Sequence, residues 1–181
     1  MLKGFATAWQ FLTRINLFKE ANFDQESLGK AYRFFPLVGL ILGLFLALLG
    51  YSASKLFQPL TVAIILVTAD ILLTGGLHLD GFMDTCDGIY SGRGRDRILE
   101  IMKDSRVGSM GVLGALVLLG LKVSFLYELA GTTAFLPGLI VMPLFSRWCM
   151  IMVMAVYPSA RQQGLGRQFK ADMSEDRKSV V

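Results

Sequence analysis

Three aspartates, Asp80, Asp84 and Asp87, follow one another at intervals of four and three residues in the stretch GGLHLDGFMDTCDG. On an α-helix, residues at these intervals lie on one face. Three like charges on one face repel each other, so the arrangement destabilises a helix unless a cation neutralises it. Hard divalent cations prefer carboxylate oxygens. The spacing therefore predicts a magnesium site formed by all three, with Asp84 also a candidate catalytic residue and Mn²⁺ able to substitute.

The residues around this triad are of the kinds that bind phosphate. Gly81 and Gly88 directly follow two of the aspartates, and a glycine lets a bulky phosphate approach the backbone. Arginine and lysine near a metal–carboxylate group suit a phosphate-rich substrate. His78 is the single histidine, and both a structural and a functional role stay open for it. The candidate substrate-binding residues are His78, Gly81, Gly88, Arg93, Arg95, Arg97, Lys103 and Arg106.

A fourth carboxylate, Asp104, lies apart from the triad. Residues 95–106 are expected to form a short helix that carries Glu100 and Asp104 at an interval of four. Asp104 is the candidate general base, but the neighbouring Lys103 and Arg106 lower its pKa and make it a weaker base. A role as a metal ligand therefore stays open for Asp104.

The competing interpretation of this segment is a solvated loop with scattered charges. It accounts well for Asp96, Arg97 and Glu100, which can lie in water without a function. It accounts poorly for the triad, because those carboxylates begin where an apolar run of the sequence ends.

The apolar residues are concentrated in four long runs. Hydrophobic residues make up 54% of the chain and charged residues 18%, whereas soluble domains have about 45–50% and about 25%. A membrane-spanning helix needs about 20 mostly apolar residues. The predicted spans cover residues 34–51, 60–77, 110–129 and 135–157.

Lysine and arginine in the connecting segments predict the orientation of these spans. Five basic residues lie before the first span, five between the second and third, and five after the fourth, against Lys55 alone in the other two loops. Both termini and residues 79–108 are therefore expected to face the cytoplasm. These basic residues flank apolar runs and form no stripe with interleaved aromatics, so no nucleic-acid partner is expected.

The pattern as a whole predicts a single all-α integral membrane domain over residues 1–181, with about four transmembrane helices. Its parts are an amphipathic cytoplasmic segment (1–33), a bundle (34–157) with a helical catalytic loop (79–108), and a cytoplasmic tail (158–181). In the first part, four apolar residues recur at helical spacing: Phe5, Trp9, Leu12 and Ile15. This helix is expected either at the membrane interface or packed on the protein's own cytoplasmic face.

Three ionisable residues, Asp70, Lys122 and Arg147, fall inside the predicted spans. Charges at membrane depth are costly and face a bundle interior or a wet cavity. Pairing among the three is the structural interpretation, and a polar cavity that reaches up to the catalytic loop is the functional one.

In its motifs the chain resembles the cobalamin synthase family. The segments that carry the resemblance are GGLHLDGFMDTCDG (75–88), LEIMKDSRVGSMGVLG (99–114), FPLVGLILG (35–43), FLTRI (11–15) and SRW (146–148). They occur in the family's order and cover most of residues 5–166. The tail departs from the family pattern beyond about Gly166, and family members run longer, so we expect a C-terminally short chain.

The resemblance implies a magnesium-dependent enzyme in the bacterial cytoplasmic (inner) membrane that acts late in cobalamin biosynthesis. Such an enzyme joins adenosylcobinamide-GDP to α-ribazole, or to its 5′-phosphate, and releases GMP. The product is adenosylcobalamin or its 5′-phosphate. Association with other cobalamin-assembly enzymes is a further expectation from the resemblance.

Two other functions compete with this one. A CDP-alcohol phosphotransferase that makes a phospholipid would carry an Asp-x-x-Asp-Gly-x-x-Ala-Arg block, but Gly88 is followed by Ile-Tyr-Ser-Gly and the Ala-Arg is absent. A small, non-catalytic transporter subunit would be expected to show repeated halves, and the sequence has no repeat.

Overall fold

The computed structural model describes residues 2–18 and 29–160 of the chain. These residues form helices and no strand, which confirms the all-α prediction. The elements are α1 (Leu2–Leu12), the 3-10 helix η1 (Tyr32–Phe34), α3 (Phe35–Ala53), α4 (Pro59–Thr74), α5 (Leu77–Ile89), α6 (Arg95–Ile101), α7 (Ser109–Leu129) and α8 (Phe135–Val156).

The four apolar runs are all helical, with bounds close to those predicted. Within the described ranges, three helices are long and apolar enough to cross a membrane, and a fourth span exists if the bent pair α4–α5 counts as one. This composition makes the protein an all-α membrane protein with the lipid bilayer as its surroundings.

The chain divides into two compact units, Met1–Leu48 with Leu136–Val181 and Leu49–Phe135. In the first unit, α3 and α8 approach so closely that two glycines of α3 have no room for a side chain. A Cβ on Gly39 would lie 2.5 Å from the Pro143 carbonyl oxygen, and one on Gly43 would lie 2.5 Å from that of Ile140. Small residues at such crossings let helix backbones pack directly on one another.

Helix α1 packs on the protein through aromatic side chains. The rings of Phe5 and Phe34 meet edge to face at 6.0 Å, and those of Phe11 and Phe35 stack at 5.8 Å. Trp9 is buried, and its indole N–H donates to a backbone carbonyl at 2.8 Å. Trp9 and Leu12 of the predicted apolar face are thus buried within the protein, whereas Ile15 is 37% exposed. The position of this helix relative to a membrane stays a prediction.

In the second unit, α4 ends in a sharp bend. The sequence predicted a span before this point and a loop after it, but not the bend itself. Gly75 and Gly76 both adopt left-handed backbone conformations, with φ of 63° and 71°. The Gly76 N–H donates to the Ile71 carbonyl at 2.9 Å and the Gly75 N–H donates to that of Leu72 at 3.3 Å, which is a Schellman ending. Helix α5 begins at once, at 91° to α4.

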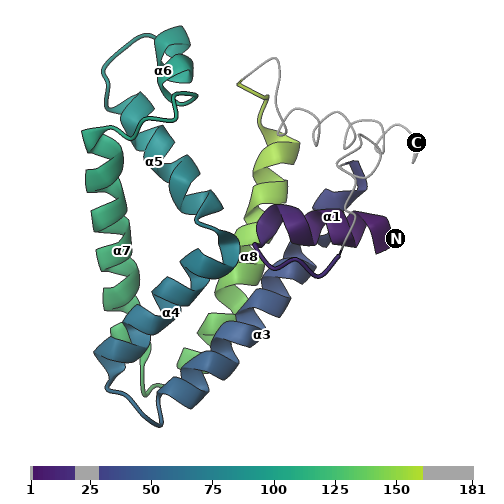
Figure 1. The fold of residues 1–181 in the computed structure, drawn as a ribbon, viewed down its shortest axis with the longest axis vertical. Coiled ribbons are helices and arrows are strands. Elements are labelled where there is room, and N and C mark those ends of the chain that lie inside the picture. Colours follow the sequence, from purple (N-terminus) through teal and green to yellow (C-terminus); the bar gives the residue numbers. More distant parts are fainter. Residues whose placement is uncertain (1, 19–28, 161–181) are drawn as a thin grey trace. The chain divides into compact units, whose positions relative to one another are not determined.

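Helix α7 lies beside both arms of this bent pair, with α5 along its first half and α4 along its second (Figure 1). The 16 residues of α4 cover only about 24 Å, less than the roughly 30 Å hydrocarbon core that α7 can cross. Together α4 and α5 are long and apolar enough to form one span that is broken at the bend. The catalytic loop predicted from residue 79 therefore begins with a helix that continues the second apolar run.

An ion pair joins α4 to α7 on the α4 side of the bend. The Lys122 ammonium lies 3.0 Å from the Asp70 carboxylate, and their side chains are 34% and 18% exposed. The Thr74 hydroxyl donates to the Asp70 backbone carbonyl at 2.8 Å, so the polar side chain of Thr74 has a hydrogen-bond partner in the last turn of α4. Pairing is confirmed for Asp70 and Lys122, whereas Arg147 is buried in α8, in the first unit.

Candidate functional site

The three aspartates of the predicted metal site all stand on α5, as their spacing required. Asp80 is exposed, while Asp84 and Asp87 are half-buried. Because the helix turns 100° per residue, Asp87 lies at the edge of the shared face that turns toward α7. The helix thus carries Asp80 at an exposed position and Asp84 at a half-buried one, and directs Asp87 to its neighbour.

The Asp87 carboxylate is bound by the backbone at the start of α7. Its Oδ2 accepts a hydrogen bond from the Gly108 N–H at 2.8 Å, and its Oδ1 accepts one from the Gly111 N–H at 2.7 Å. Sequence reasoning missed both partners, because they lie 21 and 24 residues away. The one available signal in the sequence was the glycine-rich segment GSMGVLG. This segment lacks the lysine that a phosphate-binding loop needs, and its glycines pack on α5 instead.

The two glycines predicted to admit phosphate have different surroundings. A Cβ on Gly81 would meet nothing within 4 Å, so the backbone beside Asp80 is open. Gly88 is buried, and a Cβ there would lie 2.7 Å from the Met102 side chain and 3.1 Å from that of Ile98. Gly88 therefore allows α6 to pack on α5, and only Gly81 combines a neighbouring carboxylate with open space.

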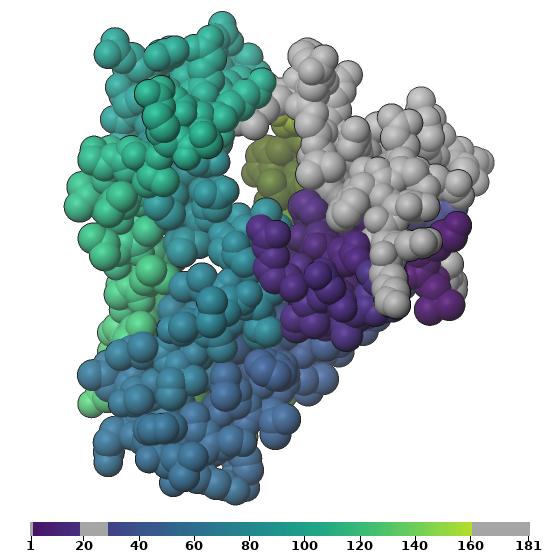
Figure 2. All heavy atoms as spheres, in the orientation of Figure 1, coloured from purple at the N-terminus to yellow at the C-terminus, as the bar shows by residue number. Residues whose placement is uncertain are grey.

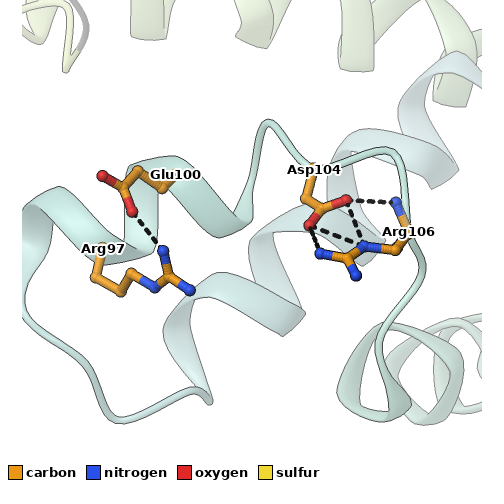
Figure 3. Close-up of polar contacts among 4 residues, drawn as sticks. All are labelled: Arg97, Glu100, Asp104 and Arg106. Carbon is orange, nitrogen blue, oxygen red and sulfur yellow. Dashed lines mark hydrogen bonds and ion pairs between the residues drawn. The ribbon is translucent and has the colours of Figure 1, made fainter.

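Helix α6 is shorter than predicted. It ends at Ile101, so Asp104 lies outside it and does not share a helix face with Glu100. Glu100 instead accepts a hydrogen bond from Arg97 at 2.6 Å (Figure 3). The predicted helix over residues 95–106 was wrong in its second half because Asp104 engages the backbone locally, a contact that competes with helix continuation.

Asp104 and Arg106 form a paired unit in the turn between α6 and α7 (Figure 3). The Arg106 guanidinium donates to both carboxylate oxygens, with the shortest contact 2.6 Å, and the Arg106 backbone N–H donates to Oδ1 at 3.0 Å. The side-chain hydrogen bonds of Arg106, followed by its backbone bond, lower the pKa of Asp104 to about 2. A carboxylate with so low a pKa is a poor proton acceptor near neutral pH.

The remaining candidate residues lie on α5, on α6 and in the segments on either side of α6. His78 lies half-buried in the first turn of α5. The cationic side chains are all exposed, namely those of Arg93, Arg95, Arg97, Lys103 and Arg106. In Figure 2 the atoms of residues 80–110 form one continuous body at an end of their unit. The sequence-predicted carboxylates and cations are thus carried by one compact part of the chain.

Comparison with known proteins places the chain in a family. The family model described as cobalamin-5-phosphate synthase matches residues 4–181. The chain belongs to this family. Relatives named adenosylcobinamide-GDP ribazoletransferase include those of Clostridioides difficile, 39% identical over 93% of the chain, and Desulfitobacterium hafniense, 43% identical over 90%. A relative with the same name in a Roseiflexus species is 41% identical over 91% of the chain.

The chain spans about 60 to 65% of the length of these curated relatives. No solved structure matches it.

The donor set on α5 suits a hard cation, because it consists of carboxylates alone. Within residues 2–18 and 29–160, no three His, Cys, Asp or Glu side chains lie close enough together to bind one metal ion. Asp80, which is exposed, and Asp84, which is half-buried, stand one helical turn apart on α5. The Asp87 carboxylate accepts two hydrogen bonds from backbone N–H groups and has further lone pairs besides these two.

Proposed function

We propose that the chain transfers the cobinamide-phosphate part of adenosylcobinamide-GDP to α-ribazole or to its 5′-phosphate. A ribose hydroxyl oxygen attacks the phosphorus joined to cobinamide, a new P–O bond forms, and the bond to the second phosphate breaks. GMP leaves, and the hydroxyl proton passes to a base or to water. The observation that carries the proposal is that α5 carries three aspartates in a chain of the cobalamin-5-phosphate synthase family.

Magnesium is part of this proposal, with Asp80 and Asp84 as the residues that would hold it. When bound, the metal neutralises charge on the pyrophosphate and polarises the attacked phosphorus. Mn²⁺ is expected to substitute, since its oxygen-ligand preference is similar. The open backbone at Gly81 supports this arrangement, because a phosphate beside Asp80 would meet no side chain there.

The cations of the α6–α7 turn are proposed to bind the phosphates. Lys103 is exposed, and Arg106 is held in place by its bonds to Asp104. Such transfers depend mainly on positioning and charge neutralisation, so the protein need supply little covalent chemistry. Since the pKa of Asp104 is lowered to about 2, we propose that Asp104 orients Arg106 and that water or the substrate accepts the proton.

The proposed location is the bacterial cytoplasmic membrane, with α5 and α6 facing the cytoplasm. The excess of basic residues between the second and third apolar runs supports this orientation. Association with other cobalamin-assembly enzymes stays a prediction.

The direct test is a product assay with the purified chain in lipid nanodiscs. Adenosylcobinamide-GDP, α-ribazole and Mg²⁺ are expected to yield GMP and a cobalamin product, and omission of any one should prevent GMP formation. A second arm supplies CDP-diacylglycerol and an alcohol. Release of CMP in that arm, without GMP in the first, would assign the chain to phospholipid synthesis instead.

A further inference from the structure

The contact between Asp87 and α7 has the geometry of a helix cap supplied from another helix. The first N–H groups of an α-helix have no partner within it, and a side chain at the N-cap often binds one. The N-cap of α7 is Gly108, which has no side chain to do so. Asp87 supplies the missing acceptors, one oxygen to Gly108 and one to Gly111.

Electrostatics favours this contact at both ends. A carboxylate in the last turn of a helix lies near the negative end of the helix dipole, and Asp87 occupies that position in α5. The start of α7 is a positive end, and a negative charge placed there is stabilised. The two hydrogen bonds therefore satisfy the orphan amides of α7 and also compensate the unfavourable position of Asp87 in its own helix.

The glycines of α7 are fitted to this carboxylate. The three atoms nearest to a Cβ built on Gly108 all belong to the Asp87 carboxylate, and two of the three nearest to one on Gly111 do. Gly108 has φ of −90° and ψ of 169°, a conformation that any residue adopts. Backbone strain therefore does not require glycine at Gly108, and the approach of Asp87 is the constraint that remains.

From these contacts we propose that Asp87 is a positioning residue that clamps the start of α7 to the end of α5. The inference rests on the proposed function and separates the roles within the triad. Asp80 and Asp84 serve the metal and phosphates, while Asp87 closes the segment between α5 and α7. That segment carries Lys103 and Arg106, so the clamp holds the phosphate-binding turn at the end of the carboxylate helix.

A double-mutant cycle between Asp87→Ala and Gly108→Ala tests the clamp without any activity measurement. Alone, Gly108→Ala displaces the Asp87 carboxylate and should lower the melting temperature by a few degrees. In the Asp87→Ala background the same substitution meets no carboxylate and should cause little further change. Gly120→Ala, on the same helix with nothing within 4 Å, is the matched control and should not lower the melting temperature.

Hydrogen exchange of the α7 amides supplies the second measurement. In Asp87→Ala, exchange at Gly108 and Gly111 should quicken about tenfold or more, as expected for loss of charge-assisted bonds. Asp87→Asn keeps one acceptor oxygen and should protect one of the two amides, which keeps the test informative if the alanine variant does not fold. Asp84→Asn should leave both amides protected.

Equal losses from Gly108→Ala with and without Asp87, or unchanged exchange in the Asp87 variants, would overturn the clamp. Both measurements use the unliganded protein. A chain that passes them but forms no GMP would therefore refute the proposed function and leave the clamp standing.

Discussion

The two units of this protein use glycine for different kinds of helix contact. In the first, Gly39 and Gly43 of α3 lie against the backbone of α8. In the second, Gly108 and Gly111 of α7 lie against the Asp87 carboxylate, and Gly114 lies against the Cys86 side chain. One contact joins backbone to backbone, and the other joins backbone to side chains on the helix that carries the triad.

This difference indicates where each contact can yield. A helix backbone can make room only by shifting as a whole, because its own hydrogen bonds hold its atoms together, so atoms added at the α3–α8 contact are costly. A short side chain can rotate away, but Asp87 then gives up two hydrogen bonds. We therefore expect the first contact to affect stability, and the second, through the proposed clamp, to couple the stability of the fold to the placement of the proposed site.

The largest effect is expected from Gly43→Val in the first unit. Even the first added carbon would lie 2.5 Å from the Ile140 carbonyl oxygen and 2.8 Å from its Cα, neither of which can rotate away. We expect a loss of about 3 kcal/mol, the upper end for overpacking, seen as a lower melting temperature in nanodiscs. A loss no greater than that of Gly108→Ala would remove the distinction between the two kinds of contact.

The next effect is expected from Lys122→Met in the second unit. The substitution leaves Asp70 partly buried without its ion-pair partner, at a cost of about 2 kcal/mol. Because α4 and α7 would keep their apolar packing, Asp70→Asn combined with Lys122→Met should recover part of this loss. If the single variant is as stable as wild type, the pair does not hold α4 to α7.

A smaller effect is expected at the bend between α4 and α5. Gly76 has φ of 71° with nothing within 4 Å of a built Cβ, so Gly76→Ala meets backbone strain but no clash. The expected cost is about 1 kcal/mol, measured by thermal unfolding. A variant that is more stable than wild type would indicate that α4 and α5 can join as one straight helix.

The smallest effect concerns pH. Since Arg106 lowers the pKa of Asp104 from its usual 3.8 to about 2, the pair stabilises the folded state above about pH 4. This contribution is lost as the pH falls through 2. Arg106→Gln should therefore lower the melting temperature slightly at pH 6 and by less as the pH approaches 2. A difference that grows with acidity would contradict the assigned pairing.

Much of the fold was predictable because apolar runs of membrane length leave few alternatives. The helices α3, α7 and α8 lie within a few residues of their predicted spans. The bend was not predictable, since Gly75 and Gly76 equally suit the end of a span. The partner of Asp87 was not predictable either, because a contact across more than 20 residues depends on how α5 and α7 pack.

The most direct test of the account compares GMP release by wild type, Asp84→Asn and Gly120→Ala, each at increasing Mg²⁺. Asp84 lies on α5 and has the proposed metal role, whereas a Cβ on Gly120 would meet nothing within 4 Å. We predict wild-type rates for Gly120→Ala and a loss of about 100-fold for Asp84→Asn in a chain that still folds. Wild-type GMP release by Asp84→Asn at every Mg²⁺ concentration would contradict the assignment of the site to α5.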